Sequence, residues 1–142
     1  MGIGGRVRAA EALALAGLHP RDVPHTRVQG ELGRIRGEQA EARVVSLLQQ
    51  ADLVPPWILG ARRAAPAEDR RGVDVLVQTD VGILRVQVKC SHRKAKDFAR
   101  RLRRRRRAGT IGIVVVPPEI GDEDARERVI LALAAMRRGQ ER

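Results

Sequence analysis

Three polar side chains near the middle of the sequence have the types and the spacing that phosphoryl chemistry requires. They are Asp74, Gln87 and Lys89, and the last two stand at alternate positions of one apolar run. A carboxylate and a neutral oxygen a few ångströms apart suit a hard cation such as Mg²⁺. A lysine beside them could orient or deprotonate a water, or neutralise charge that builds on a phosphate. A plain surface salt bridge between Asp74 and Lys89 is the alternative that these residues leave open.

A β-hairpin would bring the three side chains together. Residues 73–78 and 83–89 are rich in β-branched residues, and Thr79-Asp80-Val81-Gly82 between them is typical of a turn. If the turn is centred on its middle peptide bond, Asp74 lies opposite Gln87, and the three polar side chains share one face. The other face then carries Val73, Val75, Val77, Leu84, Val86 and Val88. A register shift of one residue would bury the polar cluster, so the valines favour this register.

The elements before the hairpin are a helix and a weak strand. Apolar residues at helical spacing predict a helix over residues 30–53, which Pro55 and Pro56 end. Its predicted buried stripe is Ala40, Val44, Leu47, Leu48 and Ala51. Residues 54–71 are predicted to be a loop with a short strand around residues 57–59. A further short helix is expected over residues 8–16.

A basic helix, a buried strand and a last helix follow the hairpin. Residues 93–107 predict the basic helix, which Gly109 would close. The apolar run 110–116 predicts a strand buried on both faces. Asp122 is the expected N-cap of the last helix, whose buried stripe would contain Val129, Ile130, Leu133 and Met136. This order predicts an α/β fold with a central sheet.

The hairpin and its surroundings resemble the PD-(D/E)XK, or restriction-endonuclease-like, nuclease superfamily. Asp74, Gln87 and Lys89 match its D-x(n)-(D/E/Q)-x-K signature, and the element order matches its αβββαβ core. The segment Gly37-Glu38-Gln39-Ala40-Glu41 looks like the start of archaeal Holliday-junction resolvases and their relatives. The resemblance covers roughly residues 36–118. It implies a central mixed sheet flanked by helices.

The resemblance also implies a role for each site residue. Asp74 would be the main metal ligand, with the side-chain oxygen of Gln87 and the carbonyl of Val88 completing the shell. Lys89 would be the catalytic lysine. Glu41 would be the helix glutamate that binds a metal or a metal-bound water, and it is preferred because it borders the apolar stripe. Glu38, one turn earlier, is the competing candidate.

The sequence departs from the superfamily pattern at two positions. Gln87 stands where Glu or Asp is usual, which removes one negative charge and should weaken metal binding. Val73 stands where proline is usual. The resemblance thus implies a Mg²⁺- or Mn²⁺-dependent DNA endonuclease acting on structured or branched DNA such as Holliday junctions. The alternatives are a nuclease-fold protein that binds nucleic acid without cutting it, or a basic RNA- or ribosome-associated protein.

Basic residues of the predicted helix 93–107 are candidates for gripping DNA phosphates. These candidates are Arg93, Lys94, Arg100, Arg101, Arg103, Arg104, Arg105, Arg106 and Arg107. Phe98 and Leu102 are four residues apart, so one helix face could dock while the arginines surround the rest. Ser91 is the predicted cap of this helix, with His92 beside it, and Cys90 is a predicted core residue. A solvated basic segment is the alternative to a phosphate ridge.

Composition agrees with a polyanionic partner. The 142 residues carry 28 Lys and Arg against 17 Asp and Glu, a formal charge of +11. One Trp, one Phe and no Tyr argue against stacking of single-stranded bases, and one Cys excludes an intrachain disulfide. No stretch has the length of a membrane span, so we expect a cytoplasmic protein that does not bind membranes.

Two segments are predicted. Residues 1–29 would form a helical arm, which could support a homodimer or cap the core of a monomer. Residues 30–142 would form the nuclease-like domain.

Overall fold

The computed structural model describes residues 25–104 and 111–141. The chain divides between Glu38 and Gln39 into two units, and α2 (His25–Leu48), the first helix among the described residues, spans these two positions. The helix predicted over residues 8–16 lies outside the described residues. Helix α2 ends at Leu48, and the short 3₁₀ helix η2 (Ala51–Leu53) follows it before the two prolines. Ala51 was predicted to be buried but is exposed, because the helix ends before it.

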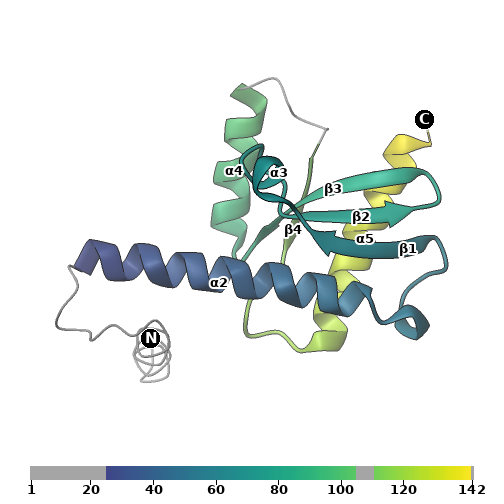
Figure 1. Cartoon of the computed structure of the whole chain (residues 1–142), viewed down its shortest axis with the longest axis horizontal. Helices are drawn as coiled ribbons and strands as arrows, with labels where there is room; N and C mark the ends of the chain where they lie inside the picture. The colour runs from purple at the N-terminus through teal and green to yellow at the C-terminus, as the bar shows by residue number, and fades with distance from the viewer. Residues whose placement is uncertain (1–24, 105–110, 142) are drawn as a thin grey trace. The chain divides into compact units, whose positions relative to one another are not determined.

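Four strands form one mixed sheet in the order β1-β2-β3-β4 (Figure 1). They are β1 (Ile58–Arg63), β2 (Val75–Thr79), β3 (Gly82–Lys89) and β4 (Gly112–Val115). The first three are antiparallel neighbours, and β4 pairs with β3 in parallel. The strand predicted around residues 57–59 is therefore longer than expected. A four-residue helix, α3 (Pro66–Asp69), lies in the segment that was predicted to be a loop.

The predicted hairpin register is confirmed. Leu76 pairs with Arg85, and Val75 pairs with Val86. The turn is stabilised by Thr79, whose Oγ1 donates a hydrogen bond to the Gly82 carbonyl over 2.7 Å. Gly82 has a φ of +111°, a conformation that side-chain-bearing residues rarely adopt. The β-branched residues and the turn glycine therefore fix which residues of the two strands meet.

The larger core covers one face of the sheet. The inward residues of β2 and β3, such as Val75, Val77 and Val86, pack with Val44 of α2 and Leu133 of α5 (Asp122–Gln140). In Figure 1 helix α5 lies behind the strands. Of its predicted stripe, Val129 and Leu133 are fully buried, while Ile130 and Met136 are partly buried against the same core.

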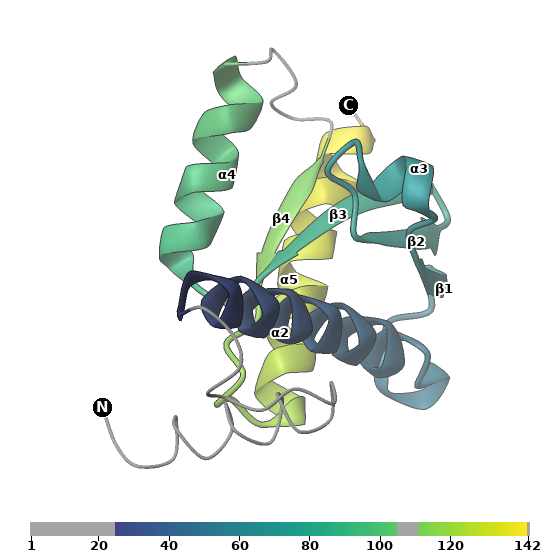
Figure 2. The ribbon, with the colours of Figure 1, turned by 60° about the vertical axis from the view of Figure 1, so that its left-hand side comes forward.

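A smaller apolar cluster lies on the opposite face, under α4 (His92–Arg104). It contains Val73, Leu76, Leu102 and Ile111, with Phe98 partly buried beside them. Figure 2 shows α4 and α5 on opposite sides of β3 and β4. Val73 was predicted to face the larger core, and this is wrong. It precedes β2, and the preceding Gly72 turns the backbone with a φ of +87°.

Helix α5 has acidic residues in its first turn and basic residues in its last turn, as expected, but its N-cap is not the predicted residue. Gly121 is the N-cap, so the prediction of Asp122 in that role is wrong. Asp122, Glu123 and Asp124 occupy the first turn, and Arg137 and Arg138 the last, which complements the helix dipole. Asp122 instead forms an ion pair of 2.9 Å with Arg43 of α2. No helix in the described part of the chain is long and apolar enough to cross a membrane.

Candidate metal centre

Asp74 lies at the open end of the hairpin, one residue before β2, and only 5% of it is exposed. Its Oδ2 accepts a hydrogen bond of 2.8 Å from the amide of Val88. Its own amide donates to the carbonyl of Val86 over 2.9 Å, and its carbonyl accepts from Ala64 over 2.8 Å. These backbone bonds fix the carboxylate between β1 and β3.

Three carboxylates converge at this end of the sheet. One oxygen each of Glu41, Asp69 and Asp74 lies within 4.8 Å of the other two. Glu41 comes from α2 and is half-buried, whereas Asp69 ends α3 and is exposed. Oxygens from three separate elements thus meet at one point, as a cation site requires.

The two candidate glutamates of α2, Glu41 and Glu38, have different environments. Glu41 contributes to the carboxylate group and forms an ion pair of 2.7 Å with Arg63 of β1. Glu38 is exposed and accepts a hydrogen bond of 2.8 Å from Arg34, one turn away on the same helix. The structure therefore includes Glu41 in the acidic group.

Gln87 and Lys89 flank Val88, whose amide contacts Asp74, and the charges of Lys89 and Asp74 influence each other. That Gln87 projects from the same face as Asp74 stays a prediction. Gln87 is 7% exposed, and its Oε1 is buried without a hydrogen-bond partner among the described residues. The Nζ of Lys89 lies 5.0 Å from the centroid of the Phe98 ring of α4. Val88 reaches Asp74 through its amide rather than its carbonyl, so metal ligation by that carbonyl stays a prediction.

The electrostatics of the site favour a bound cation. Burial raises the pKa of Asp74 to about 7, and the negative charges of Glu41 and Asp69 add to this effect. The Val88 amide and Lys89 oppose it without cancelling it. Burial also lowers the pKa of Lys89, although the charge of Asp74 opposes that change. Three carboxylates against the charges of Lys89 and Arg63 leave this group of residues acidic.

The donor set fits a hard divalent cation. Carboxylate oxygens and a neutral amide oxygen are the ligands that Mg²⁺ and Mn²⁺ take in proteins. The buried Oε1 of Gln87 has no hydrogen-bond partner in the described part of the chain, and a metal ion would supply one. Glu41, Asp74 and Gln87, which the sequence singled out, would hold such an ion.

Asp69 was not predicted. It lies in a segment too short for any periodic pattern, and its distance along the chain from Asp74 matches no motif considered. One signal was available, since Pro66 and Gly72 bracket the segment as they often bracket a short helix. A helical turn closed by a glycine would have returned Asp69 toward the hairpin.

The basic helix α4 presents its charges to solvent. Six of the nine predicted phosphate-binding residues lie in α4 and are exposed, while Arg105, Arg106 and Arg107 lie outside the described residues. Leu102 is buried against the sheet, which confirms the predicted docking face. Ser91 is confirmed as the cap, because its Oγ accepts a hydrogen bond of 3.3 Å from the Lys94 amide. His92 is the exposed first residue of the helix.

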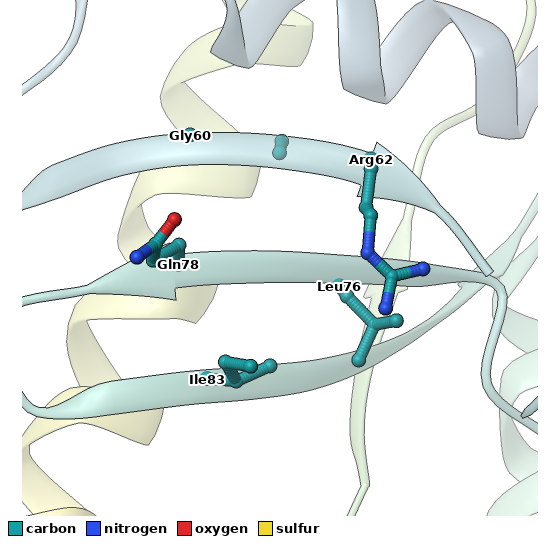
Figure 3. Close-up of a pocket in the computed structure, with 6 residues that line it drawn as sticks. Gly60, Arg62, Leu76, Gln78 and Ile83 are labelled. Atoms are coloured by element: carbon teal, nitrogen blue, oxygen red, sulfur yellow. The ribbon is translucent and has the colours of Figure 1, made fainter.

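A shallow hollow of about 280 Å³ lies elsewhere, on the outer face of β1, β2 and β3 (Figure 3). Its lining residues are Gly60, Ala61, Arg62, Leu76, Gln78 and Ile83. The charged group among them, Arg62, donates hydrogen bonds of 3.0 and 3.3 Å to Glu68. The hollow contains neither a carboxylate nor a lysine, so the chemistry is concentrated at Asp74 instead.

Comparison with protein-family models, with curated proteins and with solved structures finds no match to this chain.

Proposed function

We propose that this protein is a Mg²⁺- or Mn²⁺-dependent nuclease that hydrolyses phosphodiester bonds in DNA. One observation carries the proposal. A buried carboxylate, Asp74, lies among two further carboxylates, with the partnerless oxygen of Gln87 and the ammonium of Lys89 on the same hairpin. Metal ligands and a lysine on one hairpin supply what phosphodiester hydrolysis requires.

The element order supports a restriction-endonuclease-like fold. A helix, three antiparallel strands, a helix and a strand parallel to β3 follow one another along the chain. This is the αβββαβ order that the resemblance implies. The additional helix α3 lies in the connection between β1 and β2 and leaves that order intact.

Each residue of the centre would have a definable part in the reaction. Glu41, Asp74 and Gln87 would hold the cation, which when bound lowers the pKa of a water and polarises the phosphate. Lys89 would donate a hydrogen bond to a phosphate oxygen or, when neutral, accept a proton from the attacking water. Its lowered pKa makes the neutral form more accessible than in an exposed lysine.

Phe98 would position the lysine. Its ring packs beside Gly72 and lies under the Lys89 ammonium, 5.0 Å from ring centroid to Nζ. A cation over an aromatic face is attracted to it, which restricts where the ammonium can lie. Phe98 therefore connects the basic helix to the reacting centre.

The basic helix supplies the DNA-binding surface in this proposal. Its exposed arginines would contact phosphates, which carry shape rather than sequence information. The net charge of +11 favours such contacts. The resemblance to junction resolvases makes a four-way DNA junction the first substrate to test.

A non-catalytic nucleic-acid-binding protein is the second candidate, and Gln87 is the observation that favours it. A neutral amide at this position gives a bound cation less negative charge than a carboxylate would. A protein of this kind would bind DNA through α4 and leave it uncut.

A cleavage assay tests the proposal. Labelled linear duplex, single strand, flap and four-way junction are incubated with the full chain in Mg²⁺, Mn²⁺ or EDTA. Asp74→Asn and Lys89→Ala should abolish metal-dependent cutting. Asp80→Asn is the matched control, because Asp80 is paired with Arg137 at the other end of the hairpin. Equal cutting by Asp74→Asn would contradict the proposal, and tight binding without cutting in any metal would favour the second candidate.

A further inference from the structure

Asp69 gives the centre a third carboxylate that the hairpin signature does not contain. It is the last residue of α3, in the connection between β1 and β2. None of the salt bridges among the described residues involves it or Asp74, whereas Glu41 is paired with Arg63. Two of the three carboxylates thus lack a cationic partner in an ion pair.

The backbone around Gly72 brings Asp69 to the site. The Gly72 amide donates a hydrogen bond of 2.9 Å to the carbonyl of Asp69, and the Val73 amide donates one of 3.2 Å to Glu68. With its φ of +87°, Gly72 turns the chain from α3 toward β2. The positions of Asp69 and Asp74 are therefore set by one tight turn.

The spacing of the oxygens suits one shared cation after a small adjustment. Two oxygens on opposite sides of a Mg²⁺ ion, each bonded at about 2.1 Å, are about 4.2 Å apart. The oxygens of Glu41, Asp69 and Asp74 lie within 4.8 Å of one another. Since Asp69 is an exposed side chain, a rotation of its carboxyl group can close the difference.

Gln87 provides an independent indication of a ligand at this place. It is 93% buried, and its Oε1 has no hydrogen-bond partner among the described residues. It follows Val86, which pairs with Val75, and it precedes Val88, whose amide donates a hydrogen bond of 2.8 Å to Asp74, so Gln87 lies at the same open end of the hairpin as the carboxylates. A buried acceptor without a donor is costly, and a cation at the carboxylates would satisfy it.

We infer that Asp69 is a ligand of the divalent cation, and that its carboxylate supplies the negative charge that Gln87 does not. The inference depends on the proposed function for its catalytic meaning. Metal binding itself can be measured without cleavage. The cation would then be shared by Glu41, Asp69 and Asp74, with Gln87 as a neutral fourth ligand.

Binding of Mn²⁺ alone to the full chain, measured by electron paramagnetic resonance of free Mn²⁺ and by calorimetry, tests this inference. Asp69→Asn should weaken Mn²⁺ binding by at least about 10-fold. The matched control is Asp97→Asn, an exposed aspartate of α4 with the same change of charge, which should leave binding unchanged. Circular dichroism of each variant checks that the fold is kept.

A second variant tests whether the affinity lost in Asp69→Asn can be restored. Gln87→Glu in the Asp69→Asn background should restore Mn²⁺ affinity toward that of the wild type, because it returns one carboxylate to the centre. If Asp69→Asn binds Mn²⁺ like Asp97→Asn while Asp74→Asn does not, the inference about Asp69 is wrong and the proposed centre stands. If the wild type itself binds no Mn²⁺ at millimolar concentrations, both fail.

Discussion

The two ends of strand β2 carry aspartates with opposite environments. Asp80, in the turn, is exposed and accepts hydrogen bonds of 2.8 and 2.6 Å from Arg137 of α5. Those bonds lower its pKa. Asp74, at the open end, is buried among other carboxylates, and burial raises its pKa to about 7. One strand is thus flanked by a carboxylate in an ion pair, Asp80, and by one that takes part in none of the ion pairs among the described residues, Asp74.

This difference suggests different roles for the two carboxylates: Asp80 stabilises the fold, whereas Asp74 is available to bind a cation. The negative charge of Asp80 is neutralised within the fold, so it connects the turn to α5 and has no capacity left for a ligand. Burial of Asp74 costs free energy, which the nearby charge of Lys89 offsets only in part. Strongly perturbed groups of this kind are concentrated at functional sites. The following predictions test whether this contrast is functional.

The largest expected effect is on cleavage. Asp74→Asn should lower the rate of metal-dependent cutting by about 100-fold or more, since an amide is a weaker ligand than a carboxylate. Asp80→Asn should stay within about twofold of the wild type, as is usual for exposed sites outside the reacting centre. Single-turnover rates on a labelled junction measure both. If Asp80→Asn lost as much cleavage rate as Asp74→Asn, the proposed functional difference between the two aspartates would be wrong.

The next effect is on stability without metal. With EDTA present, the raised pKa of Asp74 means that folding becomes less favourable as pH rises from about 4 to about 7. Asp74→Asn should remove this dependence and stabilise the protein at pH 8. A pKa raised to about 7 corresponds to roughly 4 kcal/mol, which solvent screening of the partly accessible carboxyl reduces to roughly 2 kcal/mol. Below pH 4 the variant and the wild type should be alike, because the carboxyl is then protonated in both the folded and unfolded states.

Asp80→Asn should behave in the opposite way. The pKa of Asp80 is lowered, so its stabilising effect is present above pH 4 and is lost as the carboxyl is protonated at lower pH. The variant should be slightly less stable than the wild type at neutral pH. Urea denaturation between pH 3 and pH 8 measures both variants, and the same sign for both at pH 8 would contradict the interpretation.

A smaller effect is expected from the glycines at the two ends. Gly72 and Gly82 both have positive φ, so replacing either with alanine should cost about 1–3 kcal/mol. A Cβ at Gly72 would also lie 3.2 Å from the Phe98 ring, whereas none of the atoms around Gly82 would lie within 4 Å. We expect Gly72→Ala to be the more destabilising variant, and the only one of the two to weaken Mn²⁺ binding. Denaturation and calorimetry test this pair.

The smallest effects on stability and cleavage are expected from the two cation–π contacts, one at each end of the hairpin. Lys89 lies over Phe98 at the open end, and Arg137 lies 5.3 Å from the Trp57 ring centroid at the turn. Phe98→Leu should destabilise the fold by about 1 kcal/mol and also slow cleavage several-fold. Arg137→Gln should destabilise the fold less than Phe98→Leu does and leave cleavage unchanged. Equal cleavage by both variants would remove the positioning role of Phe98.

The hairpin was the most predictable part of the molecule. Alternating valines with a glycine-ended turn specify both the strands and the pairing of Leu76 with Arg85, because any other register would bury charged groups. The paired residues end at Val75 and Val86, so the placement of Asp74 opposite Gln87 stays a prediction. Helix α5 was predictable for a similar reason, since its apolar residues recur at helical spacing.

What the sequence did not show depends on single backbone torsions and short segments. Helix α3 has four residues, too few for a period, so Asp69 was missed. The prediction for Val73 was wrong because Gly72 departs from extended geometry, and a glycine in a sequence does not indicate which of its many conformations it takes. β1 was expected to be short because its glycine and two arginines weaken a strand pattern. Sheet pairing with β2 outweighs that weakness.

The position of Trp57 has a spectroscopic consequence. It is the chain's one tryptophan, and there is no tyrosine, so intrinsic fluorescence comes from the turn end of the sheet. At about 3.3 Å per residue, the six residues from Asp80 to Asp74 separate the two ends by roughly 20 Å. Emission from Trp57 should therefore report unfolding of the whole sheet while being little quenched by Mn²⁺ at the carboxylates. The protein thus contains its own optical reporter, remote from the ion whose binding is to be measured.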